Sequence, residues 1–235
     1  MMKLIVLELR KNRLKSFHLA VLFCGIALLA MEFFWTAIPY LDPNDGDSAL
    51  FLSYNFTMGL NHILGTGMFA ILGGTLGGKL VVEPYGGKGA FVEPTYPVAR
   101  SKLIGAKLIL TFLYAAGAMA VCGFICDGVF FLAGLFLNLS PELLTVNMLP
   151  GFFMSLAGHS LIAGALSLGA VWIGFVKKSL TAAIVASVIL GVVLCQILSS
   201  SLSCRAVLGI LTGICLLAAG LAVRNLCHRV QVMEV

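Results

Sequence analysis

Long apolar stretches alternate with short polar ones between residues 17 and 223 of this 235-residue chain. Most of the stretches contain the roughly 17–25 residues that a helix needs to cross a bilayer core of about 30 Å. The pattern predicts six membrane-spanning helices, at residues 17–38, 51–74, 107–137, 149–175, 180–198 and 206–223. The third stretch is longer than a perpendicular crossing requires, so we expect that helix to tilt, to kink or to project from the bilayer.

The polar segments divide this single transmembrane domain into parts. Near the N-terminus, Leu4, Ile5 and Leu7 alternate with basic residues, which favours a helix lying in the membrane interface. A solvated basic N-terminus is the alternative. The predicted parts are an interfacial helix (1–16), spans one and two (17–75), a cytoplasmic loop (76–107), spans three to six (108–223) and a cytoplasmic tail (224–235).

Composition and charge agree with a membrane protein that has little soluble mass. The chain is 60% hydrophobic and 11% charged, whereas soluble domains are about 45–50% apolar and about 25% charged. Its net charge of +5 does not indicate nucleic-acid binding, because the basic residues lie at the edges of the spans. With six spans, 14 of the 15 basic residues fall on one side, and only Arg205 falls on the other. This asymmetry predicts that both termini are cytoplasmic.

The segment 93–107, with the sequence EPTYPVARSKLIGAK, is a polar and basic island between spans two and three. Pro94 and Pro97 prevent a helix from continuing through it, and nothing after Pro97 breaks a helix. We expect a short surface helix that leads directly into the third span, with Arg100, Lys102 and Lys107 facing water.

Polar residues interrupt the apolar stretches, and five of them are candidates for a function. Ionisable side chains are costly in a bilayer and usually face the interior of a bundle or a wet pathway. These residues therefore form a possible substrate path, or else a structural hydrogen-bond network, or groups close to the outer water. They are Glu32, Asn61, His62, Asp127 and His159. His62 and His159 lack a third ligand of suitable spacing, so no metal site is predicted.

No motif for chemistry is complete. The segment GGTLGGKL at residues 73–80 resembles a phosphate-binding loop, but Leu80 stands where Ser or Thr should bind Mg²⁺. Its glycines are better explained by close helix approach. Ser160 follows His159 directly, and adjacent helical positions do not face each other, so we predict no catalytic residue. Among the seven cysteines there is no Cys-x-x-Cys pair, and pairing of Cys195 with Cys204 stays open.

The segment at 93–107 resembles the cytoplasmic loop of ABC-2-type transporter permeases, in which a proline, an arginine and a following lysine precede the third span. The layout of the whole chain is similar as well. Its small size resembles bacterial exporters of amphipathic peptides, such as those for phenol-soluble modulins and those of lantibiotic immunity. The segment between spans five and six (199–205) is shorter than the re-entrant helices of larger members.

The resemblance implies a permease in the bacterial cell membrane that exports an amphipathic substrate, such as a peptide. ATP and Mg²⁺ would be bound by two copies of a separate ATPase subunit, and a second permease, identical or different, would complete the assembly. The chain itself would carry no cofactor and contact only these proteins and lipid. The residues of the coupling helix would be Glu93, Pro94, Tyr96, Pro97, Arg100, Ser101 and Lys102. The alternatives are a non-transporting immunity or scaffold protein, an exporter of a lipid or drug, and a membrane enzyme.

Overall fold

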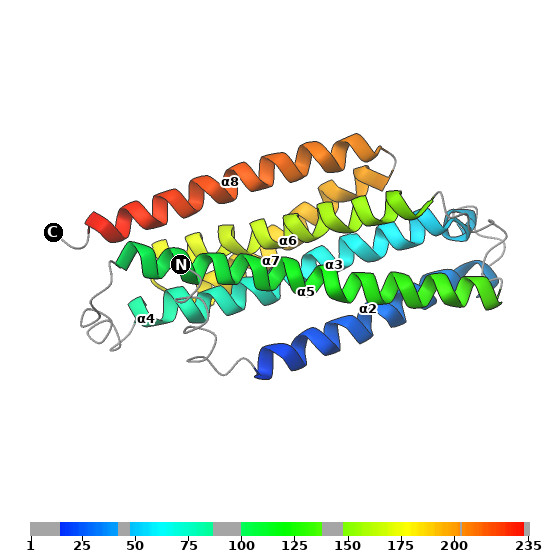
Figure 1. Cartoon of the computed structure of the whole chain (residues 1–235), viewed down its shortest axis with the longest axis horizontal. Coiled ribbons are helices and arrows are strands. Elements are labelled where there is room, and N and C mark those ends of the chain that lie inside the picture. Colours follow the sequence, from blue (N-terminus) through cyan, green and yellow to red (C-terminus); the bar gives the residue numbers. More distant parts are fainter. Residues whose placement is uncertain (1–14, 42–47, 87–99, 138–147, 203, 233–235) are drawn as a thin grey trace.

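The computed structural model describes residues 15–41, 48–86, 100–137, 148–202 and 204–232, which form an all-α bundle (Figure 1). Six helices in these ranges are long and apolar enough to span a membrane, which confirms the predicted fold class. The elements are α2 (Lys15–Leu41), η1 (Ser48–Leu52), α3 (Tyr54–Gly77), η2 (Gly78–Val82), α4 (Glu83–Gly86), α5 (Arg100–Leu137), α6 (Leu149–Val176), α7 (Leu180–Leu198), η6 (Ser199–Leu202) and α8 (Arg205–Val232).

Helices α3 and α6 form the centre of the bundle. Their most apolar windows are 67% and 72% buried, against only 11% for α2 and for α8. In Figure 1, α2 and α8 lie on opposite sides of the bundle. Polar residues in the middle of these two helices, among them Asn61, His62 and His159, are therefore enclosed by other helices.

The outer faces of the helices are covered with large apolar side chains. Phe23 of α2 is 63% exposed, Phe136 of α5 is 83% exposed and Leu217 of α8 is 72% exposed. Apolar surface on this scale is rare on soluble monomers, and it is suited to contact with lipid.

The glycine-rich segment lies in α3 and the π-helical η2, and its glycines are where the neighbouring helices come closest. A Cβ atom added to Gly77 would lie 2.3 Å from Val171 Cγ2 of α6 and 2.7 Å from Thr111 Cγ2 of α5. A Cβ atom on Gly74 would lie 2.6 Å from Ser187 Cβ of α7. The interpretation of these glycines as helix contacts is confirmed.

The chain stays helical beyond the predicted end of the second span. Sequence analysis placed that end at residue 74 and a loop from residue 76, but α3, η2 and α4 continue the helix to residue 86. A glycine costs a solvated helix about 1 kcal/mol. Here that cost is offset by the packing that the absent side chains allow, and Leu80, Val81 and Val82 are buried at 3%, 0% and 1% exposure.

Helix α5 begins at Arg100, three residues after Pro97, and runs without interruption through 38 residues. The predicted helix after Pro97 and the predicted third span are therefore one element. Lys102 is exposed as expected, but the expectation for Lys107 was wrong, because this side chain is only 2% exposed. The predicted coupling residues Glu93, Pro94, Tyr96 and Pro97 lie outside the described residues, as does the predicted interfacial helix up to residue 14.

A tight turn joins α6 to α7. The Lys178 amide donates to the Phe175 carbonyl, and the Ser179 amide donates to the Gly174 carbonyl, both at 3.1 Å. Lys178 adopts the left-handed conformation, with φ of 51°, that this helix-ending arrangement requires. The turn makes α6 and α7 antiparallel neighbours, as predicted.

Several helix ends that carry basic residues lie near one another. The start of α2, the segment η2 after α3, the start of α5, the turn between α6 and α7 and the end of α8 all lie toward the same end of the bundle (Figure 1). These segments carry Lys15, Lys79, Lys102, Lys177 and Arg229. That this end faces the cytoplasm stays a prediction from the charge distribution.

Candidate functional site

His62 is the centre of a polar cluster at the other end of the bundle. Its Nε2 lies 2.9 Å from Asp127 Oδ2 and its Nδ1 lies 3.0 Å from Ser155 Oγ. The His62 side chain is 2% exposed and that of Asp127 is 13% exposed. One buried imidazole of α3 is thus held between α5 and α6.

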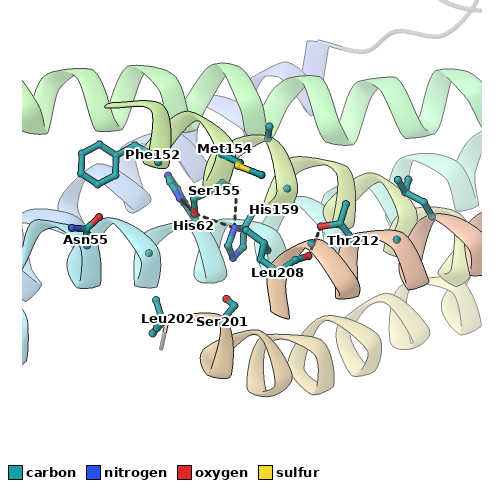
Figure 2. Close-up of a pocket in the computed structure, with 17 residues that line it drawn as sticks. Asn55, His62, Phe152, Met154, Ser155, His159, Ser201, Leu202, Leu208 and Thr212 are labelled. Atoms are coloured by element: carbon teal, nitrogen blue, oxygen red, sulfur yellow. Dashed lines mark hydrogen bonds between the residues drawn. The ribbon is translucent and has the colours of Figure 1, made fainter. Parts of the chain in front are cut away.

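His159, one turn after Ser155 on α6, extends this network. Its Nδ1 lies 2.9 Å from the Ser155 carbonyl oxygen and 3.4 Å from Ser155 Oγ. The rings of His62 and His159 have centroids 5.7 Å apart. The two histidines are therefore linked through one serine (Figure 2).

Two groups that can only accept hydrogen bonds set the direction of the network. A carbonyl oxygen accepts, so His159 Nδ1 carries the hydrogen and donates to Ser155. At the other end, the carboxylate of Asp127 accepts from His62 Nε2–H. With neutral rings, the Ser155 hydroxyl then donates to His62 Nδ1, and His159 Nε2 remains as an acceptor.

A second pair lies beside this network, between α2 and α3. Asn61 Nδ2 donates to Glu32 Oε2 at 3.2 Å. Glu32 is 0% exposed and Asn61 is 2% exposed. Glu32 Oε1 and Asn61 Oδ1 are buried and have no hydrogen-bond partner among the described residues.

Local helix geometry explains why these side chains converge. Asn61 and His62 are adjacent on α3, so their side chains leave the helix about 100° apart. One therefore reaches α2 and the other reaches α5 and α6. Thr66 donates its hydroxyl to the His62 carbonyl at 2.8 Å, and Thr36 donates likewise to the Glu32 carbonyl at 2.8 Å. These threonines satisfy their own hydroxyls within the helix and leave the cluster undisturbed.

The five residues predicted as a possible substrate path are brought together in this cluster. Sequence reasoning missed Ser155, although its spacing of four from His159 places both on one helix face. Ser160, by contrast, donates to the Ala157 carbonyl at 2.9 Å. The predicted coupling residues Ser101 and Lys102 lie at the far end of α5, about 40 Å from Asp127 at 1.5 Å per residue.

A cavity of about 510 Å³ adjoins the cluster. It lies between α3, α6, η6 and α8 (Figure 2). His62, Ser155 and His159 form part of its wall, and the rest is mainly apolar. The other residues that line it are Asn55, Gly59, Gly151, Phe152, Met154, Ala157, Gly158, Ser201, Leu202, Leu208, Gly209, Thr212, Gly213 and Leu216.

The described residues contain no group of three or more His, Cys, Asp and Glu side chains that could hold a metal ion. Cys195 and Cys204 are free thiols. Cys195 Sγ lies 3.3 Å from the Ile63 carbonyl oxygen, to which it can donate. The chemistry of the site is therefore that of hydrogen bonds between histidine, serine and carboxylate groups.

The chain is similar to a protein of Bacillus subtilis (strain 168) that is described as the uncharacterized protein YcbO. The two are 28% identical over 197 residues, which cover 80% of this chain and 81% of the relative. No protein-family model and no solved structure matches the chain.

Proposed function

We propose that this chain is the permease subunit of an ATP-driven exporter and moves an amphipathic substrate with a separate ATPase. The observation that carries the proposal is the buried polar cluster inside a bundle of membrane-spanning helices. Burying a carboxylate and two imidazoles in such a place costs stability, and proteins usually retain such groups along substrate pathways. The adjoining cavity gives the pathway a volume in which a substrate can bind.

Helix α5 supplies a mechanical connection. Its first turn holds Arg100 and Lys102, which resemble the ATPase-contacting residues of ABC-2-type permeases. The same unbroken helix holds Asp127 about 40 Å further on. A displacement of the start of α5 by ATP binding in the partner would be transmitted along the helix to the hydrogen bond between Asp127 and His62. The relative arrangement of α3, α5 and α6 would change, and with it access to the cavity.

The proposal places both termini and the start of α5 in the cytoplasm. It also includes a second copy of this chain or a related permease, together with two ATPase subunits. The chain performs no covalent chemistry of its own, and ATP and Mg²⁺ act in the partner.

Charge reversal at the start of α5 tests the coupling. The tagged full chain is purified from its own cell membrane in mild detergent, and vanadate-sensitive ATP hydrolysis in the eluate is measured. The double variant Arg100→Glu with Lys102→Glu is expected to reduce this co-purifying activity at least tenfold. Lys177→Glu is the matched control, because Lys177 is exposed at the same end of the bundle. Equal ATP hydrolysis with the double variant and the control would refute the proposed coupling.

A further inference from the structure

His159 is one of the residues that line the cavity, and its ring has an unused acceptor. The side chain is 2% exposed, and its Nε2 is buried without a hydrogen-bond partner among the described residues. Because Nδ1 donates to the Ser155 carbonyl, the neutral ring leaves a lone pair on Nε2. Buried polar atoms are normally paired, so this one indicates a missing donor.

The lining of the cavity defines the charge of the ligand. Among the described residues that line it, none is Asp, Glu, Lys or Arg. An ion entering this space would lose its hydration without gaining a counter-ion from the wall, which is costly. A neutral O–H or N–H donor can pair with His159 Nε2 without this cost.

The size and the walls of the cavity define the rest of the ligand. Its volume of about 510 Å³ is in the range of small-molecule sites. Three turns of a helix of about 10 Å diameter occupy on the order of 1,300 Å³, so a helical amphipathic peptide does not fit. Leu202, Leu208 and Leu216 give the cavity an apolar lining. Met154, also in the lining, is 75% exposed on the outer face of α6, so the cavity reaches the lipid-facing surface.

We propose that this cavity binds a small neutral amphiphile, whose hydroxyl or amide head donates to His159 Nε2 and whose apolar tail lies along α8. The ligand enters from the bilayer, because the cavity reaches the outer face of the bundle. That this ligand is the transported substrate rests on the proposed function. Its binding does not, since the cavity is formed by this chain alone.

Photolabelling of the purified full chain in phosphatidylcholine nanodiscs tests the inference without any ATPase. Two probes are compared, a monoacylglycerol and a fatty-acid methyl ester that carry the same diazirine-labelled chain. Only the first has hydroxyl donors. One neutral hydrogen bond corresponds to a preference of about fivefold. Peptides from the cavity-lining parts of α6 and α8 are therefore expected to be labelled about fivefold more by the monoacylglycerol.

Two substitutions distinguish the contribution of the ligand's polar head to binding from that of its apolar tail. His159→Phe keeps a ring but removes the acceptor, and it is expected to bring the ratio of the two probes to about one. Gly213→Leu fills the cavity and is expected to reduce labelling by both probes severalfold. Gly220→Leu is its matched control, because a Cβ at either glycine meets nothing within 4 Å and only Gly213 lines the cavity.

Equal labelling by the two probes in the unmodified chain would overturn the inference, as would equal effects of the two leucine substitutions. Labelling confined to outer-face residues such as Leu217 and Leu221 would show contact with bulk lipid only and would also overturn it. If labelling follows the expectation while charge reversal at α5 leaves ATP hydrolysis unchanged, the proposed function fails and the binding site stands. The reverse result refutes the binding site alone.

Discussion

Replacing Gly77 by alanine should weaken the centre of the bundle, because this glycine lies between two helices at once. The new Cβ would lie 2.3 Å from Val171 Cγ2 and 2.7 Å from Thr111 Cγ2. Carbon atoms are in favourable contact at about 3.5–4.0 Å. Both neighbours would have to move by about 1 Å, and they belong to different helices, α6 and α5.

The expected cost follows from two opposing terms. Overpacking of a well-packed core costs about 1–3 kcal/mol. The better helix propensity of alanine returns up to about 1 kcal/mol. We therefore expect Gly77→Ala to lower the free energy of unfolding by up to about 2 kcal/mol. The same change at Gly117 of α5, where an added Cβ meets nothing within 4 Å, should be neutral or slightly stabilising.

The assay is the thermal unfolding midpoint of the purified chain in one detergent, measured for both variants. A further variant tests whether the contact with Val171 causes the loss of stability. Val171→Ala removes Cγ2, the atom in the closest contact, so the double variant Gly77→Ala with Val171→Ala should be more stable than the sum of the two single effects predicts. If Gly77→Ala is as stable as Gly117→Ala, or if the two substitutions are strictly additive, the packing interpretation is refuted.

Three further changes test the polar cluster and the turn between α6 and α7 by the same assay. Asp127→Ala should lower the free energy of unfolding by about 1–3 kcal/mol, because it leaves the N–H of the buried His62 imidazole unpaired. A loss of stability equal to that of Glu83→Gln, a substitution of an exposed residue at the opposite end of the bundle, would contradict this. Asn61→Ala should cost a similar amount, because Glu32 Oε2 loses its donor, and no change in the unfolding midpoint would show that this hydrogen bond contributes nothing. Lys178→Gly should raise the free energy of unfolding by about 1 kcal/mol, because glycine adopts positive φ without steric cost. A lower thermal unfolding midpoint for this variant would exclude strain at the turn.

Sequence patterns predicted the number of spans well because lipid imposes a simple rule. Every backbone polar group in the bilayer core must be paired inside the segment, so apolar length alone predicts a helix. For the five polar residues, the cost of burying ionisable groups predicted the bundle interior or a wet pathway, with proximity to the outer water as the alternative. The structure buries Glu32, His62 and His159 inside the bundle. The structure then adds what sequence cannot supply, namely which of these side chains contact each other.

The differences between the predicted and the observed structure have physical causes as well. The predicted second span ended at residue 74, among the glycines that precede Lys79. Inside a tight bundle the same residues let four helices approach, and the helix continues. Lys107 was expected at the water from its charge, but α5 turns this position inward. Neither outcome follows from local sequence, because both depend on which helices are neighbours.

The pattern of satisfied and unsatisfied atoms favours the proposal that the polar cluster is functional over a purely structural role. A structural cluster is expected to pair all its polar atoms, since each unpaired one costs about 1–3 kcal/mol. Here His62 and Asp127 are fully engaged, whereas Glu32 Oε1, Asn61 Oδ1 and His159 Nε2 are buried and unpaired among the described residues. With Asn61 Nδ2 donating to Glu32 and with a neutral His159 ring, Asn61 Oδ1 and His159 Nε2 are acceptors, and Glu32 Oε1 is one as well when the carboxyl is ionised. Of these three residues only His159 lines the cavity, so the proposed neutral ligand, by donating a hydroxyl or amide hydrogen to it, would offset the cost of one unpaired acceptor.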